Sequence, residues 1–538
     1  MYPLRMDDAR VNPAKISFIA RLESGPAQTP SPWKAFGGPD FSDWLLKFWA
    51  KCGMVFQGMR RPDLRYVGPG CWELPRQGNM KSAARIYATE EMLDSVYEDR
   101  VHMQLANVAS LPGIVGPAMA MPDFHWGYGF PIGGVAAFDL DEGVISPGGV
   151  GYDINCGVRL LATGLELKEV NRRLRELVEQ LFRDVPTGVG SSGVLSVSQR
   201  ELEDVVRQGA RWAVGRGYGS ESDLEFIEEG GMMRETNVEA VTPRSWKRGK
   251  EQLGTLGSGN HFLEIGYVDE VYDFKAAEAF GLRENQVTLM VHCGSRGFGY
   301  QICDDYLKEM AHTGEKYGIE IPERQLVCAP FKSEEGQAYF HAMNCAVNYA
   351  FANRQVIASL AGRALKKALG LSDAELGLRT VYEVAHNIAK VETHTYEEQS
   401  RRLCVHRKGA TRAFATGHEE VPSRYRAIGQ PVLVPGDMGR ASYVVCGTEK
   451  AMKSTFGSSC HGAGRRMSRT RAEKSAHGRD IAAELLKRGV VVRGQSRKTL
   501  AEELPEAYKD VSQVVEACKT AGIATKVVRL RPIGCVKG

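Results

Sequence analysis

The spacing of hydrophobic and polar residues switches several times along the chain between a helical period and strand-like runs. Apolar residues recur at helical spacing in the stretches 89–107, 168–183, 199–213, 331–365, 480–487 and 512–521, which predicts helices. Short apolar runs predict buried strands at 134–139, 158–163, 286–292 and 432–434. The two kinds of element alternate too irregularly for a doubly wound parallel sheet, and no fixed-period repeat is present. The sequence therefore predicts a mixed α+β fold.

The first 72 residues differ from the remainder in composition. Proline, glycine and serine are concentrated in the runs 24–32 and 36–40, and the segment holds ten Lys or Arg against six Asp or Glu. Such a segment buries little apolar surface, so residues 1–72 are predicted to be a loosely ordered extension. Because Met54, Met59 and Met80 follow closely, an artefact of start-site choice is the alternative interpretation. The compact domain is predicted to span residues 73–538.

Composition narrows the class of protein without identifying it. Hydrophobic residues make up 43% of the 538-residue chain and charged residues 25%, as in soluble globular proteins. The net charge is +4, so a nucleic-acid site must be a local basic patch. The twelve cysteines are scattered without a Cys-x-x-Cys pair, which indicates reduced thiols. No long apolar run or signal-peptide pattern is present, so we expect no membrane contact and a cytoplasmic location.

Glycine-rich runs carry the candidate metal chemistry. Many of the 59 glycines lie around Asp, His and Ser, where the backbone turns sharply or approaches a ligand closely. Asp153 and Cys156 are three positions apart, a spacing that lets a carboxylate and a thiolate bind one metal ion or bridge two. His261, His292 and His386 each lie beside a turn that contains glycine or asparagine. Each motif alone also fits an ordinary turn or a core residue, but together they provide donors for two divalent ions.

A second group of residues indicates phosphate chemistry. His461 is flanked by small residues in Ser-Ser-Cys-His-Gly-Ala-Gly, which leaves the space around the imidazole that a nucleophile needs. Arg465 follows it closely, and Arg296 follows the histidine at 292; arginine suits bidentate contact with phosphate. Asp123 lies beside another glycine-rich turn. Three functions stay open from the residues alone: covalent nucleotidyl transfer, a binuclear metal phosphodiesterase, and a non-catalytic RNA-binding protein, against which the small net charge counts.

Several strings of the sequence resemble, in the same order, those of the RtcB family of tRNA-splicing and RNA-repair ligases. They are MPDFHWGYGFPIGG, GVGYDINCGVR, GSGNHFLEI, HCGSRGFG, AHNIAK, HRKGATRAF, PGDMGRASY, SSCHGAGR and the terminal Lys537-Gly538. The resemblance extends from residue 83 to the end and leaves residues 1–72 outside it. It implies a complex mixed fold in which strand ends and glycine-rich loops build a central cleft for metal and nucleotide.

The resemblance implies an RNA ligase that joins a 3′-phosphate or 2′,3′-cyclic phosphate end to a 5′-hydroxyl end, with tRNA halves or broken RNA as substrate. GTP and two Mn²⁺ ions would be the cofactors. His461 would carry GMP covalently, with Asp123 as an acid close to the metals. The implied metal ligands are Asp153, Cys156, His261, His292 and His386, with Cys156 bridging the two ions. The implied GTP contacts are Asn260, His261, Phe262, Leu263, Glu264, His386, Asn387, Pro435, Gly436, Asp437, Met438, Ser442, His461, Gly462, Ala463, Gly464 and Lys537.

Further expectations concern partners and substrate contacts. Arg296 and Arg465 are predicted to contact RNA phosphates. An archease-type activator is a candidate partner, and the chain is expected to act as a monomer. Asp437 departs from the expected pattern of its turn, in which a small polar residue such as serine would stand.

Overall fold

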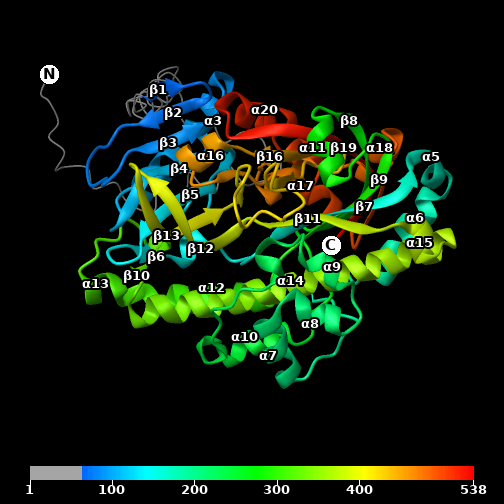
Figure 1. The fold of residues 1–538 in the computed structure, drawn as a ribbon, viewed down its shortest axis with the longest axis horizontal. Coiled ribbons are helices and arrows are strands. Elements are labelled where there is room, and N and C mark those ends of the chain that lie inside the picture. The colour runs from blue at the N-terminus through cyan, green and yellow to red at the C-terminus, as the bar shows by residue number, and fades with distance from the viewer. Residues whose placement is uncertain (1–63, 189) are drawn as a thin grey trace, which may run out of the picture. The chain divides into compact units, whose positions relative to one another are not determined.

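A computed structural model describes residues 64–188 and 190–538, which form a mixed arrangement of sheets and helices (Figure 1). Most of the described strands belong to two large sheets, and their neighbours within a sheet are often far apart in the sequence. The α+β class predicted from the sequence is confirmed.

In both large sheets the spatial order of the strands differs from their order along the chain. Across the first large sheet, the strands are β1 (Arg65–Gly68), β2 (Cys71–Leu74), β3 (Ala84–Tyr87), β4 (Ile114–His125), β5 (Ile132–Asp139), β13 (Gln399–Lys408) and β12 (Asn387–Tyr396). Across the second, they are β11 (Arg379–Ala385), β7 (Gly157–Glu166), β9 (Gln286–Cys293), β8 (Phe262–Val271), β19 (Ala524–Lys537), β16 (Ser442–Gly447) and β15 (Pro431–Val434), with β18 (Val491–Gly494) parallel to β19. Two short pairs join β6 (Val144–Ile145) to β10 (Ala329–Pro330) and β14 (Ala410–Arg412) to β17 (Ser458–Cys460).

The helices surround these sheets, and the longest, α14, passes along the second sheet (Figure 1). The helices are α3 (Leu93–Glu98), α4 (Val101–Val108), α5 (Leu167–Val170), α6 (Leu174–Asp184), α7 (Gln199–Gln208), α8 (Ala210–Gly215), α9 (Glu221–Leu224), α10 (Pro243–Gly249), α11 (Phe274–Phe280), α12 (Arg296–Glu309), α13 (Thr313–Tyr317), α14 (Glu334–Leu369), α15 (Asp373–Leu376), α16 (Glu449–Ser454), α17 (Arg469–Ser475), α18 (Ile481–Lys487), α19 (Arg497–Glu502) and α20 (Val511–Ala521). Helix α14 begins where the Ser333 side chain accepts the amide of Gly336 and ends at Gly370, whose φ is 72°. It packs against α6, α7, α8 and α12, which explains why its middle turns are buried all round.

A buried ion network connects α14 to the second sheet. Arg354 of α14 donates from Nε to Glu383 at 2.8 Å, Arg159 of β7 donates to the other Glu383 oxygen, and all three side chains are fully buried. Arg354 also donates to the carbonyls of Asn155 and Cys293, each at 2.7 Å. Charges are retained in a protein interior when they are paired and hydrogen-bonded. The network therefore fixes the loop before β7 and the end of β9 against the helix.

The predicted strands are confirmed as β5, β7, β9 and β15, and α14, α18 and α20 confirm three of the predicted helices. The stretch 168–183 forms α5 and α6 with a 3-10 turn between them. The stretch 89–107 divides at Arg100, whose φ is 50°, into α3 and α4. The stretch 199–213 divides at Gly209, whose φ is 58° and where a Cβ would lie 2.1 Å from the carbonyl oxygen of Gly231. Hydrophobic spacing does not reveal these breaks, because the buried face continues across them.

The folded part begins earlier than the sequence analysis predicted. Residues 64–72 contain β1 and the start of β2, and Trp72 lies opposite Ile86 of β3. The Trp72 indole also donates to the carbonyl of Ala88 at 3.1 Å. The boundary therefore lies before residue 64 rather than at residue 72. The prediction of a loosely ordered extension falls, for residues 1–63, outside the described residues.

The described cysteines are all free thiols, as their scattered positions indicated. In the part of the chain that the structure describes, no helix combines the length and the apolar character needed to cross a membrane.

Replacing Glu383 with alanine is expected to destabilise the fold, because Arg159 and Arg354 would stay buried without their carboxylate. Removing one partner of a buried pair costs about 3–5 kcal/mol. Urea unfolding measures the change in the free energy of unfolding. The control is Glu278→Ala on α11, where the exposed side chain should contribute less than about 0.5 kcal/mol. Equal stability of the two variants would contradict the role given to Glu383.

Candidate metal and nucleotide site

Four neighbouring strands bring their ends together at one edge of the second sheet. Strands β11, β7, β9 and β8 are antiparallel neighbours, so the starts of β7 and β8 lie beside the ends of β9 and β11. Cys156 and His261 directly precede β7 and β8, whereas His292 lies near the end of β9, opposite Phe262. His386 follows β11, and its amide donates to the carbonyl of Cys156 at 2.9 Å. Antiparallel pairing thus gathers residues that are far apart in the sequence.

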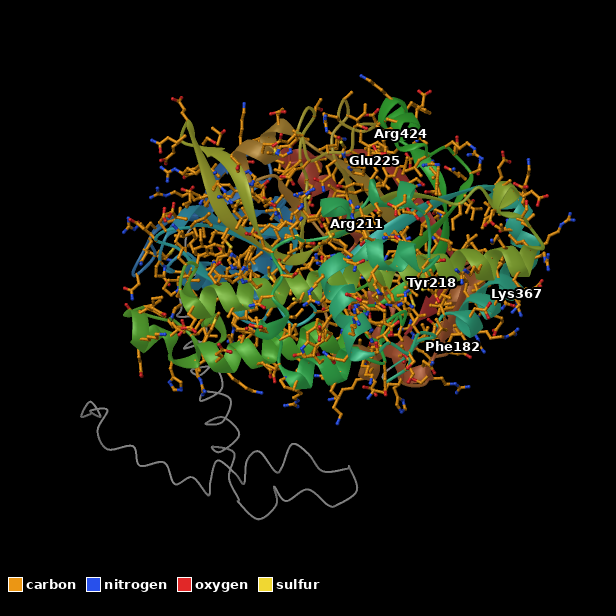
Figure 2. All side chains as sticks on the ribbon, turned by 60° about the horizontal axis from the view of Figure 1, so that its bottom comes forward. Phe182, Arg211, Tyr218, Glu225, Lys367 and Arg424 are labelled. Atoms are coloured by element: carbon orange, nitrogen blue, oxygen red, sulfur yellow. The ribbon has the colours of Figure 1, made fainter. Side chains whose placement is uncertain are left out.

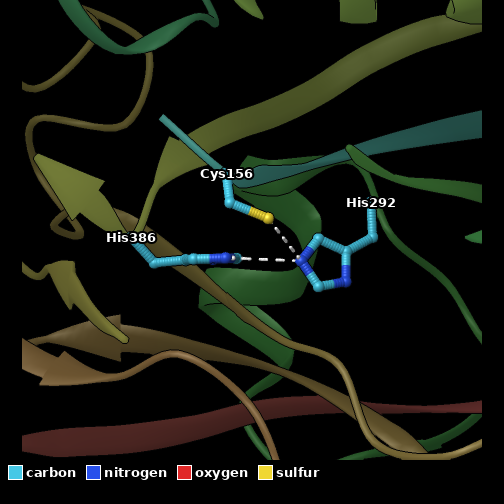
Figure 3. Close-up of side chains that lie close together, drawn as sticks. All are labelled: Cys156, His292 and His386. Carbon is cyan, nitrogen blue, oxygen red and sulfur yellow. Dashed lines mark hydrogen bonds between the residues drawn. The ribbon is translucent and has the colours of Figure 1, made fainter. Parts of the chain in front are cut away.

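The side chains at this edge form two triads of donors that share one thiol. Cys156 Sγ lies 3.2 Å from His292 Nε2, which lies 3.3 Å from His386 Nε2 (Figure 3). The same sulfur lies 3.4 Å from His261 Nε2, which is 2.8 Å from Asp153 Oδ2. Within each triad the donor atoms lie within 4.8 Å of one another. The structure therefore brings all five predicted metal ligands together.

The chemistry of this donor set fits divalent cations, since thiolate, imidazole and carboxylate are all ligands of transition metals. Burial lowers the pKa of His292 and of His386 well below the usual value, so both rings are neutral and keep a lone pair for a metal. Burial and the nearby Asp153 carboxylate raise the pKa of the Cys156 thiol to about 12. A cation that binds between these groups must therefore displace the thiol proton.

His461 lies beside the first triad and is oriented by Asp123. It follows β17, and its ring centre is 4.8 Å from that of His386. Asp123 Oδ2 accepts from His461 Nδ1 at 2.5 Å and from the backbone amides of His461 and Gly462 at 2.8 and 3.2 Å. Because the carboxylate accepts, Nδ1 carries the proton and the lone pair is on Nε2, on the other side of the ring. This arrangement suits a nucleophilic imidazole held by a carboxylate.

The loop that carries His461 can approach β4 closely because Gly464 has no side chain. Gly464 has a φ of 71°, and a Cβ there would lie 2.1 Å from the carbonyl oxygen of Asp123. The amide of Lys509 donates to the carbonyl of Gly464 at 3.0 Å. The small residues around His461 therefore do more than leave space, since they also permit its contact with Asp123.

Charged side chains lie at the other end of the site. Burial and the nearby Asp437 carboxylate raise the pKa of Glu264, on β8, to about 8. Lys537 of β19 donates to the carbonyl of Asn260 at 3.2 Å, and its ammonium lies 3.6 Å from Glu503. A carboxyl group beside an ammonium provides an acceptor and a donor for the edge of a heterocyclic base.

Asp437, which departs from the expected pattern of its turn, forms its polar contacts with residues of the same turn. Its Oδ1 accepts from the amide of Gly439 at 2.9 Å, and its Oδ2 lies 2.5 Å from Arg440 Nε. Burial raises the pKa of Asp437 although Arg440 opposes this shift. The carboxylate thus lines the site while its hydrogen bonds are directed into its own turn.

A cavity of about 270 Å³ extends between the metal triads and these charged residues. Most of the predicted GTP contacts line it, namely Asn260, Phe262, Glu264, His386, Asn387, Pro435, Gly436, Asp437, Met438, His461, Gly462, Ala463, Gly464 and Lys537. Three others do not. Leu263 is buried in the hydrophobic core, Ser442 accepts the amide of Gly436 at 3.1 Å, and His261 belongs to the second metal triad.

The two arginines predicted to contact RNA phosphates lie in different surroundings. Arg465 lines the cavity, but its guanidinium donates to the carbonyl of Glu502 at 2.8 Å and lies 3.1 Å from Glu503. Arg296 is not among the residues that line the cavity, and its Nη1 lies 3.2 Å from His261 Nδ1. Contact between either arginine and RNA stays a prediction.

Sequence reasoning missed part of the cavity wall, which also contains His125, Ile132, Gly409, Arg469, Glu503, Tyr508 and Cys535. His125 lies within a glycine-rich motif and could have been proposed from it. Glu503 and Tyr508, whose hydroxyl donates to Glu503, lie in a segment without such a motif. They reach the cavity through tertiary packing, which leaves no local signal.

Comparison with known proteins connects this geometry to a family. The family model described as tRNA-splicing ligase RtcB matches residues 104–538. The "tRNA-splicing ligase RtcB" of Archaeoglobus fulgidus is 52% identical over 469 residues, covering 87% of this chain and 97% of that protein. The "tRNA-splicing ligase RtcB" of Thermococcus kodakarensis is 52% identical over 468 residues, with the same coverage of both chains. The "RNA-splicing ligase RtcB" of Mycobacterium tuberculosis is 51% identical over 439 residues, covering 81% of this chain and 100% of that protein. The chain therefore belongs to the RtcB family of RNA ligases.

Proposed function

We propose that this chain joins an RNA 3′-phosphate or 2′,3′-cyclic phosphate end to a 5′-hydroxyl end, with GTP and two Mn²⁺ ions. The observation that carries the proposal is the position of His461, which lines the cavity beside the first metal triad with Nδ1 bonded to Asp123 at 2.5 Å. A binuclear phosphodiesterase would use water as its nucleophile and would not need an imidazole oriented in this way. A non-catalytic RNA-binding protein would need neither the oriented imidazole nor the metal ligands.

In the first step, His461 Nε2 attacks the α-phosphorus of GTP. The new P–N bond forms as the bond to pyrophosphate breaks, and GMP remains on the ring. Positive charge develops on the imidazole, and Asp123 stabilises it through the hydrogen bond to Nδ1. The amides of His461 and Gly462, which donate to the same carboxylate, keep the loop in this position.

In the following steps GMP activates the RNA end. An oxygen of the RNA 3′-phosphate attacks the phosphorus of GMP, the P–N bond breaks, and a phosphoanhydride joins RNA and GMP. The 5′-hydroxyl of the second RNA end then attacks the 3′-phosphorus, and GMP leaves as the new phosphodiester forms. A cyclic phosphate end must first be opened by water to give the 3′-phosphate.

The metal ions would be held by Asp153, Cys156, His261, His292 and His386. When bound, they supply charge neutralisation on the phosphates. Mn²⁺ is lowest in the general affinity order, so Zn²⁺ is expected to compete for these ligands. Zn²⁺ prefers a closed four-coordinate site, which leaves less room for phosphate oxygens.

The charged end of the cavity provides groups for guanine. An ionised Glu264 accepts hydrogen bonds only, so it matches the N1–H and exocyclic amine of guanine and not the acceptor at N1 of adenine. Lys537, whose ammonium lies close to this end, can donate to the guanine O6. We propose tRNA halves or broken RNA as the substrate. The archease-type activator, the monomeric state and the cytoplasmic location stay predictions.

The His461→Ala variant is expected to lose covalent GMP, by about three orders of magnitude or more, because the nucleophile is absent. Incubation with α-labelled GTP and Mn²⁺ measures labelling of the protein. Label on the unmodified protein should be released by acid and survive alkali, as expected of a P–N bond. His477→Ala, which removes an exposed histidine, is the control and should be labelled normally. A labelled His461→Ala protein would refute the mechanism, and an unlabelled wild-type protein would refute the function.

Cys156→Ala is expected to lose both metal sites, because its sulfur belongs to both triads. Calorimetric titration with Mn²⁺ should give a dissociation constant raised by at least about tenfold, and GMP labelling should fall with it. Cys328→Ala, which removes another buried thiol far from the triads, should bind Mn²⁺ as the unmodified protein does. Retention of one site at full affinity in Cys156→Ala would show that the thiol is not shared.

GTP binding is expected to strengthen as the pH rises from about 7 to about 9, by up to about tenfold, since guanine requires the ionised form of Glu264. Glu264→Gln cannot ionise, so its weaker binding should be flat over this range. Stability of the free protein should change in the opposite sense. The raised pKa means that the folded state holds an extra proton, so its stabilising contribution is lost as the pH rises through about 8. If GTP binding by the unmodified protein and by Glu264→Gln varies with pH in the same way, the role assigned to Glu264 is wrong.

A further inference from the structure

A second cavity, of about 860 Å³, lies beside the nucleotide cavity, and Tyr508 belongs to the walls of both. We call it the arginine groove. Its walls come from α3 and the turn before it, from Arg440, from the segment that enters α17, from the end of α18, and from the segment that enters α20. These elements are widely separated in the sequence.

The arginine groove lies directly behind the loop that carries the nucleophile. Lys509 lines it, and the amide of Lys509 donates to the carbonyl of Gly464, three residues after His461. The Lys509 ammonium donates to the carbonyl of Phe124, the neighbour of Asp123, and lies 3.7 Å from the centre of the Phe124 ring. The arginine groove thus lies against the loop that carries His461 and against the end of β4.

Three arginines in the arginine groove make no polar contact with other described side chains that would explain their position. Arg466, Arg471 and Arg488 are exposed, and none forms an ion pair or side-chain hydrogen bond with another residue in 64–188 or 190–538. Nearby arginines behave differently: Arg465 is bonded to Glu502 and Glu503, and Arg440 to Asp437. Positive side chains that are gathered in one groove and left unpaired are available to an anionic ligand.

The negative groups of the groove restrict the form of that ligand. Glu506 is paired with Arg479 at 3.2 Å, and Asp510 accepts the amide of Ser512 at the start of α20. Glu91, Glu98 and Asp99 form the wall at α3, where Asp99 interacts electrostatically with Lys509. A double helix presents phosphates on all sides and would be repelled there. A single strand can turn its phosphates to the arginines and its 2′-hydroxyl and base N–H donors to the carboxylates.

We propose that single-stranded RNA leading to the reacting end lies in the arginine groove, with its phosphates against Arg466, Arg471 and Arg488. This inference rests on the proposed function, since it assigns the path of the RNA substrate beside the nucleophile. The three contacts are expected to be electrostatic and independent of base sequence.

The test compares two triple variants that lose the same three positive charges. The first carries Arg466→Ala, Arg471→Ala and Arg488→Ala. The matched control carries Arg200→Ala, Arg211→Ala and Arg424→Ala, three exposed arginines that do not line the groove; Arg211 and Arg424 are labelled in Figure 2. The probe is a fluorescent single-stranded RNA of about 20 nucleotides with a 3′-phosphate, titrated without GTP at several salt concentrations, a length that covers the usual single-strand site.

The groove variant is expected to bind this RNA at least about tenfold more weakly than the unmodified protein, and its slope of log affinity against log salt should be smaller by about 2. The control variant should change the affinity by less than about twofold. Replacing the same three arginines with lysine should restore the slope. Equal affinities and slopes for the groove and control variants would overturn the proposal.

A measurement on the unmodified protein keeps the proposal testable if the groove variant fails to fold. RNA that contains 4-thiouridine near its 3′-end is crosslinked by light, and the crosslinked peptides are identified by mass spectrometry. Crosslinks at groove residues that do not line the nucleotide cavity support the proposal, namely those at residues 91–99, Arg466, Met467, Arg471, Arg488, Gln513 and Val514. Crosslinks confined to other residues overturn it. GMP labelling needs no RNA, so a protein that is labelled but does not use the groove separates failure of this inference from failure of the proposed function.

Discussion

The buried pairing of Arg354 with Glu383 is the interaction on which the site depends. The Arg354 guanidinium donates to three segments: to β11 at Glu383, to the loop before β7 at Asn155, and to the end of β9 at Cys293. These three segments carry the three ligands drawn in Figure 3. A lysine would offer a single point of charge in place of this planar fork, so it would not replace the arginine. The long helix therefore determines the spacing of metal donors that it does not itself supply.

Several groups of the site are neutral because they are buried. The Cys156 thiol keeps its proton, Glu264 has a pKa of about 8, and burial keeps His292 and His386 neutral. Binding of a cation would release the Cys156 proton, and binding of a guanine N–H group would release the Glu264 proton. The second triad differs, because the pKa of Asp153 is lowered to about 2 beside His261, whose own pKa is raised, so these two groups form a buried ion pair. Asp123 accepts three hydrogen bonds from the loop of the nucleophile. Orientation is thus built in before any ligand arrives.

Much of the site could be predicted from the sequence because its donors lie where strands meet glycine turns. A buried strand leads directly to His292, and the small residues on both sides of His461 indicated the free space that a nucleophilic imidazole needs. What could not be predicted depends on packing between distant segments. Leu263 alternates to the core face of its strand, and Glu503 enters the cavity from a segment without a motif. The helix breaks at 100 and 209 likewise depend on local backbone angles that hydrophobic spacing does not record.

The order of strands in the second sheet has a consequence for folding. Strand β19, which is close to the end of the chain, lies between β8 and β16. The two parts of the second sheet are therefore joined only when β19 pairs with both of these strands. Contacts between segments so far apart close large loops, and topologies of this kind fold slowly. The donor triads form on β7, β8, β9 and β11, whose alignment is also non-local. The cation site therefore requires that these four strands have paired with one another, whereas β19 pairs outside this group.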